Sequence, residues 1–265
     1  MMAPALFRPM LQEHPYTPRY ARSKLSVVSK RAKTHALVEP PGGLKAWSAL
    51  RDLWGRLRDP TRDVEFDRTW GVDTCGRIAP SAADVVGPNW LHGAEYQGCN
   101  APALDQVVQE LALPYEQFTF IDLGCGKGRA LLVAARFPFR QVLGVEYSAP
   151  LTEIARRNLS QFPSTARRCQ DIVVTQADAA SFPLPDDPLL LFFFNPFERP
   201  VMRAVAENVV ASFQRQPRRI IILYSNPVYA DVWRNVPEVT EIPTARKWIA
   251  GFEIPKAPYS SSVRE

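Results

Sequence analysis

The sequence predicts an α/β protein built on a doubly wound, Rossmann-like sheet with a helical N-terminal extension. Two observations predict this fold. Apolar segments such as Leu189–Phe194 and Arg219–Tyr224 are separated by segments of helical length, and uninterrupted apolar strands are typical of parallel sheets covered on both faces. The segment Phe118–Gly128 is an apolar run that ends in alternate glycines, as at the first strand-to-helix turn of a nucleotide-binding sheet.

The first 43 residues differ in composition from the rest of the chain. Residues 1–35 carry a charge balance of +6 in a chain of net charge +5, so the remainder is close to neutral. We expect 1–43 to be a disordered basic arm. We expect this arm to act as a solubilising tail. The alternatives are an organelle presequence in a eukaryotic source, an anionic-surface anchor and an RNA-binding arm.

The segment 44–100 is predicted to hold an amphipathic helix and a lid. Leu44–Arg58 places two tryptophans and two leucines on one helical face: Trp47, Leu50, Trp54 and Leu57. Val64–Asn100 contains many turn-forming residues and no long periodic stretch, so we expect it to wrap over the sheet as irregular chain. No run of eighteen apolar residues occurs, and we therefore expect no transmembrane segment. The four scattered cysteines suit a reducing compartment, so we expect a cytoplasmic location.

Residues 101–255 form the predicted sheet domain. Asn100 is placed to cap a helix over Ala101–Leu111, with Pro102 in its first turn. Ser148 is placed to cap a later helix in the same way. In chain order, the apolar and helix-like segments predict strand, helix, strand, helix and strand over Phe118–Leu123, Arg129–Phe137, Gln141–Val145, Pro150–Ser160 and Ile172–Gln176.

The second half of this domain ends differently from the first. Strand Leu189–Phe194, helix Pro200–Phe213 and strand Arg219–Tyr224 continue the alternation. The last two predicted strands, Val239–Ile242 and Trp248–Glu253, lie too close together for a crossover helix. We therefore expect an antiparallel hairpin there, followed by a flexible tail over 256–265.

The turn after the first strand predicts a nucleoside-binding corner. Asp122 ends the strand, and Gly124, Gly126 and Gly128 permit positive φ and close approach of a ligand. Glu146 ends the second strand, where a carboxylate can accept hydrogen bonds from a ribose diol. The P-loop is excluded because its lysine must be followed by serine or threonine. The glycine spacing also differs by one residue from the dinucleotide pattern, and Asp122 suits a ligand with a cationic amino-acid portion.

These residues resemble the first two motifs of class I S-adenosylmethionine-dependent methyltransferases. The resemblance runs from about Ala101 to Ile254 and implies strand order 3-2-1-4-5-7-6 with strand 7 antiparallel. It implies S-adenosyl-L-methionine as cofactor. The residues it assigns to the cofactor are Asp122, Gly124, Cys125, Gly126 and Gly128 for the methionine and ribose portions, Glu146 for the ribose hydroxyls, Asp178 for the adenine amine, and Tyr96 as a cover over the methionine end.

The fourth strand of the domain ends in Asn195-Pro196-Phe197. Proline disfavours helical backbone at the preceding residue, so we expect Asn195 to be extended. The segment resembles the Asn-Pro-Pro-Tyr/Phe motif of amino-group methyltransferases, although Phe197 replaces the second proline. The resemblance implies that Asn195 accepts hydrogen bonds from a target amine and that Phe197 forms a stacking wall. We therefore predict these three residues as the catalytic segment.

The methyl acceptor is the least defined part of the prediction. Gly71-Val-Asp-Thr74 resembles a segment of small bacterial class I methyltransferases, and the Asp-Leu-Gly-x-Gly-x-Gly signature is similar to that of non-SET protein-lysine methyltransferases. A nitrogen acceptor on a protein, such as lysine, or on a small molecule is favoured. The alternatives are an RNA acceptor and a non-catalytic S-adenosylmethionine-binding protein. No metal is expected, because the cysteines and histidines lack metal-ligand spacing.

Overall fold

A computed structural model of the protein describes residues 60–78 and 85–256. The predicted basic arm over 1–43, the amphipathic helix Leu44–Arg58 and most of the predicted tail over 256–265 lie outside the described residues. Of the helices within the described ranges, none has both the length and the apolar character that crossing a bilayer requires.

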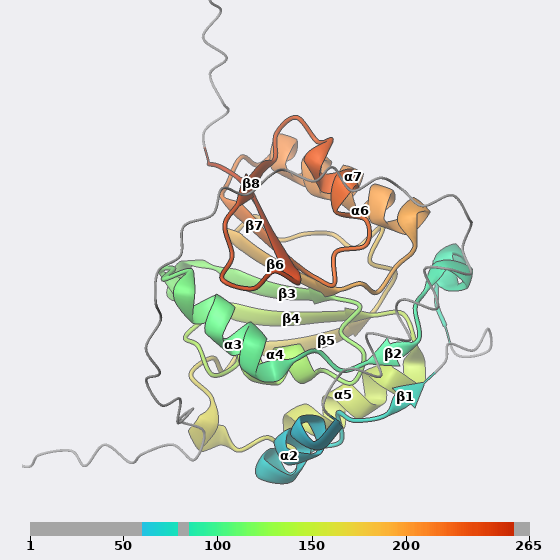
Figure 1. Cartoon of the computed structure of the whole chain (residues 1–265), viewed down its shortest axis with the longest axis vertical. Coiled ribbons are helices and arrows are strands. Elements are labelled where there is room, and N and C mark those ends of the chain that lie inside the picture. Colours follow the sequence, from blue (N-terminus) through green and yellow to red (C-terminus); the bar gives the residue numbers. More distant parts are fainter. Residues whose placement is uncertain (1–59, 79–84, 257–265) are drawn as a thin grey trace, which may run out of the picture. The chain divides into compact units, whose positions relative to one another are not determined.

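A seven-stranded sheet forms the centre of the domain (Figure 1). Its order is β5-β4-β3-β6-β7-β9-β8, and β9 pairs antiparallel with both β7 and β8. This order confirms the predicted 3-2-1-4-5-7-6 topology with an antiparallel seventh strand. The strands are β3 (Thr119–Leu123), β4 (Gln141–Glu146), β5 (Ile172–Gln176), β6 (Leu189–Phe194), β7 (Ile220–Ser225), β8 (Thr240–Ile242) and β9 (Ile249–Ile254).

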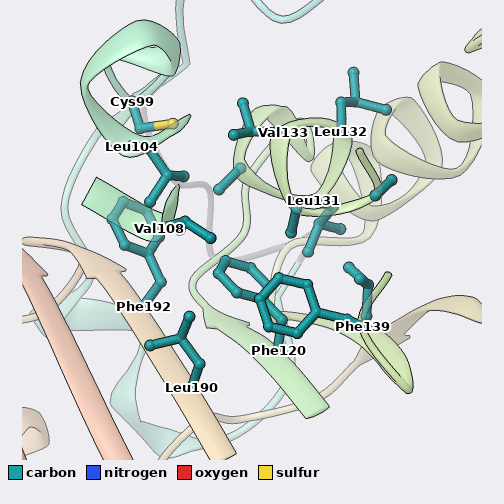
Figure 2. Close-up of a cluster of buried hydrophobic side chains, with 14 of the residues drawn as sticks. Cys99, Leu104, Val108, Phe120, Leu131, Leu132, Val133, Phe139, Leu190 and Phe192 are labelled. Carbon is teal, nitrogen blue, oxygen red and sulfur yellow. The ribbon is translucent and has the colours of Figure 1, made fainter. Parts of the chain in front are cut away.

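Two apolar clusters cover the two faces of the sheet because alternate strand residues point to opposite sides. One cluster joins α3 (Ala101–Glu110), α4 (Arg129–Ala134) and α5 (Ala149–Gln161) to one face. The other joins α6 (Arg199–Arg215) and α7 (Ala230–Arg234) to the opposite face. Figure 2 shows part of the first cluster, in which Phe120 and Phe192 lie stacked with ring centroids 6.3 Å apart.

The helix starts follow the predicted signals. Asn100 caps α3, since its side-chain oxygen accepts a hydrogen bond from the Ala103 amide at 3.1 Å. Ser148 occupies the N-cap of α5, although its hydroxyl makes no capping bond there. All predicted strands are present within one or two residues of their expected ends.

The segment before the sheet domain is more regular than expected. Pro60–Trp70 forms helix α2, which overlaps the predicted irregular stretch. The Trp70 ring packs on the ring of Phe162, which follows α5, with 5.0 Å between the ring centroids. The rest contains the two-stranded ribbon of β1 (Arg77–Ile78) and β2 (Tyr96–Gln97) and the 3₁₀ turn Pro88–His92. This part follows the carboxyl ends of the strands rather than a sheet face, because it pairs with residues that follow β4 and β6.

Candidate cofactor-binding site

The glycine turn after β3 is held in a shape that side chains would block. Gly124, Gly126 and Gly128 have φ values of +86°, +55° and +85°, which L-residues with a Cβ rarely adopt. A Cβ on Gly124 would lie 2.5 Å from the Cβ of Pro196, and one on Gly126 would lie 2.2 Å from the Tyr96 ring. The turn therefore requires glycine both for its backbone conformation and for these contacts.

Glu146 joins the end of β4 to this turn. Its carboxylate accepts hydrogen bonds from the Gly126 amide at 2.8 Å and the Ser148 amide at 3.0 Å. The side chain is buried, and burial raises the pKa of Glu146 to about 7 even though these amides lower it. Each carboxylate oxygen has two acceptor sites, so the side chain can accept two further hydrogen bonds from a ligand.

Asp122 and Cys125 lie beside Glu146 and are also buried. Burial raises the pKa of Asp122 well above its usual range, and the negative charge of Glu146 raises it further. Burial likewise raises the pKa of the Cys125 thiol, so this cysteine is a poor nucleophile. Two buried carboxyl groups with raised pKa values mark a place where a cation or a hydroxyl pair would relieve an unfavourable desolvation.

A pocket lies on one side of Gly124, at the carboxyl ends of β4, β5 and β6. Its volume is about 330 Å³, which includes space open to solvent. Asp178 and Tyr147 contribute polar groups, whereas Phe197 and Val201 contribute apolar ones. The pocket thus combines a carboxylate with flat apolar walls, which suits a purine with an exocyclic amine.

A second pocket of about 250 Å³ lies on the other side of Gly124. Asp122, Tyr96 and the buried Arg129 all line it. The Tyr96 hydroxyl donates to the Thr74 carbonyl at 2.7 Å, which holds its ring against the glycine turn. The structure therefore places Tyr96 and Asp122 in the lining of one pocket. The carboxyl of Asp122 and the guanidinium of Arg129 in this pocket fit an α-amino acid.

The segment Asn195–Phe197 stands at the end of β6, with Pro196 over Gly124 and Phe197 in the wall of the first pocket. The expectation that Asn195 is extended was wrong, because its φ is +45°. Asparagine tolerates this left-handed conformation better than most residues, and Asn226 before Pro227 repeats it at the end of β7. The Asn195 side-chain oxygen accepts a hydrogen bond from the buried Tyr224 hydroxyl at 2.8 Å.

Several residues of the site had no predicted role. Lys127 in the turn donates to the Asp73 carboxylate at 2.8 Å and to the Cys75 carbonyl, while the Asn158 amide donates to the Asp73 and Lys127 carbonyls. Arg129 donates to the hydroxyl and carbonyl of Thr74. These bonds anchor the Gly71–Thr74 segment to the glycine turn. The only signal of this contact in the sequence is opposite charge, on Asp73 in one segment and on Lys127 and Arg129 in the other.

His92 and Glu198 form a half-exposed pair next to Phe197, with 2.9 Å between Nδ1 and Oε2. The Glu198 amide also donates to the His92 carbonyl. Glu198, which follows β6, is thus paired with His92 from the segment that precedes the sheet domain. Within the described ranges, no three His, Cys, Asp or Glu side chains gather in a way that would hold a metal ion.

Comparison with protein families supports the same assignment as the topology and the turn. Residues 120–215 match the family model described as a methyltransferase domain. Residues 120–215 thus carry a methyltransferase domain, and the sheet order around them is the one that the resemblance to class I S-adenosylmethionine-dependent methyltransferases implies. This matched range contains the glycine turn, Glu146, Asp178 and Asn195, whereas the anchoring segment around Thr74 lies before it. A search of the curated proteins finds no match to the sequence.

The residues of the methyltransferase site fit its cofactor, S-adenosylmethionine. Gly124 lines both pockets, so a ligand with a purine at one end and an amino acid at the other would cross the glycine turn. Asp178 is in the first pocket, and Asp122 and Arg129 are in the second. Glu146 lies beside the turn between them, where its remaining acceptor sites suit the ribose hydroxyls.

Solved methyltransferases of several kinds are similar in fold. An RNA methyltransferase from Salinibacter ruber, solved with S-adenosyl-L-homocysteine, is 19% identical with a TM-score of 0.42, over 62% of this chain and 97% of that one. A T. thermophilus 16S rRNA methyltransferase is 18% identical with a TM-score of 0.43, over 66% and 45%. A ribosomal protein L11 methylase from Lactobacillus delbrueckii is 14% identical with a TM-score of 0.40, over 57% and 75%. Similarity at this level assigns no acceptor.

Proposed function

We propose that this methyltransferase transfers a methyl group to a nitrogen atom of an acceptor that binds beside Asn195, Pro196 and Phe197. S-adenosylmethionine supplies an electrophilic methyl group on a sulfonium. The observation that carries the proposal is the position of Pro196 over Gly124, where the two halves of the cofactor pocket meet. A group held by the adjacent Asn195 is therefore close to the middle of the cofactor path.

The bond from Tyr224 supports an accepting role for Asn195. The Tyr224 oxygen accepts from the Tyr229 amide at 3.3 Å, and its own proton is directed to the Asn195 side-chain oxygen. This contact orients the amide, because a carbonyl oxygen is the group that accepts. The second lone pair of that oxygen remains for an amine N–H. Holding an amine in one orientation lowers the entropic part of the barrier.

A protein lysine or a small-molecule amine is the favoured acceptor. A free lysine has a pKa of about 10.4 and is mostly protonated at neutral pH, so it must lose a proton before it can act as a nucleophile. Phe197, two residues after Asn195, is a buried aromatic side chain, and burial of an amine against such apolar surface disfavours the charged ammonium.

The test is to incubate the full chain and labelled S-adenosylmethionine with cell extract, beside the variants Asn195→Ala and Tyr224→Phe. We expect about a hundredfold less labelling by Asn195→Ala and about tenfold less by Tyr224→Phe. Calorimetry should show S-adenosylhomocysteine affinity unchanged in both variants. Equal labelling by the wild type and Asn195→Ala, or no labelling by any of the proteins, would contradict the proposal.

A nucleobase is the second candidate acceptor, and an exposed aromatic residue favours it. Trp248 is 42% exposed, and the Arg246 guanidinium lies 5.8 Å from its ring centroid. The Trp248 carbonyl accepts from the Asn226 amide at 2.7 Å, which puts this pair beside the carboxyl end of β7. Bases stack on such side chains. Weaker binding of single-stranded RNA by Trp248→Ala than by the wild type is expected for this candidate, and equal binding argues against it.

A further inference from the structure

The segment Val85–Ala94, here called the strap, crosses the carboxyl ends of β4 and β6. At one end, Val85 pairs with Ser148, and the Val86 amide donates to the Tyr147 carbonyl at 3.1 Å. At the other end, Gly93 pairs with Phe197, and the Ala94 amide donates to the Pro196 carbonyl at 2.9 Å. The strap is thus held on both sides of the first pocket.

Between these two ends, the strap contacts Asp178 at two positions. The Asn89 side-chain amide nitrogen donates to Asp178 Oδ2 at 2.8 Å. Gly87, with φ of +84°, lies so close that a Cβ there would be 2.5 Å from the same oxygen. The other carboxylate oxygen accepts from the Ala180 amide at 2.9 Å. Asp178 is therefore oriented from its own loop and from the strap together.

The chemistry of this contact decides which end of the Asn89 amide is bound. A carboxylate accepts hydrogen bonds and does not donate them, so the amide nitrogen must face Asp178. The amide oxygen of Asn89 then remains as a second acceptor, and Asn89 itself lines the pocket. Two residues that carry acceptors therefore line the pocket side by side, Asp178 with its carboxylate and Asn89 with its amide oxygen.

We propose that Asn89 is a base-specificity residue of the cofactor pocket. It holds the Asp178 carboxylate in place and supplies a second acceptor for the exocyclic amine of adenine. That amine has two N–H donors, which match two acceptors. A 6-oxo purine would instead present a carbonyl oxygen to both, and unpaired buried acceptors are strongly disfavoured. The proposal rests on S-adenosylmethionine as the cofactor and is independent of the methyl acceptor.

The experiment is calorimetric titration of the full chain with S-adenosylhomocysteine and with S-inosylhomocysteine, its 6-oxo analogue. The wild type should prefer the adenine ligand by about a hundredfold. Asn89→Ala should bind that ligand about tenfold more weakly and show a smaller preference. Asn89→Asp should lower its affinity further, because a second carboxylate would face Asp178.

A matched control separates base recognition from loosening of the loop between β5 and β6, which carries Asp178. Asn208 on α6 donates to the Phe182 carbonyl at 2.8 Å and so anchors the same loop away from the carboxylate. Asn208→Ala should keep the wild-type preference for adenine over the 6-oxo base. Equal binding of the two ligands by the wild type, or an unchanged preference in both Asn89 variants, overturns the proposal. Absence of S-adenosylhomocysteine binding by the wild type overturns the cofactor assignment as well.

Discussion

Replacement of Glu146 by glutamine should remove part of the pH dependence of the free energy of unfolding. Burial raises the pKa of Glu146 from 4.5 to about 7 in the folded protein, so the folded state binds this proton more tightly than the unfolded state does. The free energy of unfolding must then fall as the pH rises from about 4.5 to about 7. Each pKa unit corresponds to about 1.4 kcal/mol, which makes the loss about 3 kcal/mol.

Glutamine cannot ionise, so the variant lacks this loss. The amide can accept from only one of the Gly126 and Ser148 amides through its single oxygen, and that cost is the same at every pH. It cancels when stabilities at pH 5 and pH 8 are subtracted. Removal of the Glu146 charge also lowers the pKa of Asp122, which adds to the difference in the same direction.

Urea denaturation of cofactor-free wild type and Glu146→Gln at pH 5 and pH 8 measures the effect. We expect the wild type to lose about 2.5 kcal/mol more than the variant over this interval, since unfolded Glu146 is already mostly ionised at pH 5. The exposed residue Glu153, 67% accessible at its side chain, provides a matched control, and Glu153→Gln should follow the wild type. A difference between wild type and Glu146→Gln of less than about 0.5 kcal/mol would refute the reasoning.

Two further predictions concern the turn and its anchor. Gly124→Ala adds a Cβ 2.5 Å from the Pro196 Cβ at a φ of +86°. It should therefore destabilise the fold by about 2 kcal/mol and abolish S-adenosylhomocysteine binding in calorimetry. Retained affinity would show that the ligand does not need to pass Gly124. Asn158→Ala removes the amide that bonds Asp73 and Lys127, so urea denaturation should show a loss of about 3 kcal/mol. A loss below about 0.5 kcal/mol would show that this anchor is unimportant.

The nucleoside-binding corner could be predicted from the sequence because it depends on residues that are close together in the chain. A glycine with positive φ, an acid at a strand end and a period of apolar residues each depend on a few neighbouring positions. The strand order followed from the resemblance, and the terminal hairpin followed from the short distance between the last two strands. The placement of Asp122, Glu146 and Asp178 around one site then results from parallel strands that end at the same edge.

The helix α2 and the conformation of Asn195 were missed for a common reason. Pro60–Trp70 is polar on most of its surface, and its few apolar side chains, such as Trp70, pack on distant residues. The rule for residues before proline favours extended backbone at Asn195, but Tyr224 from the neighbouring strand binds its side chain in a left-handed conformation. In both cases tertiary contacts outweighed the local preference.

The sequence alone determined the fold class, the cofactor corner and the residues at the strand ends, because these depend on periodicity and on short-range backbone geometry. Only the tertiary structure showed that Asn89 contacts Asp178, that Lys127 and Arg129 anchor the Asp73–Thr74 segment, and that Tyr224 orients Asn195. These pairs are separated by between 29 and 89 positions in the chain. No local pattern encodes such a contact, since it exists only after the sheet has brought the strand ends together.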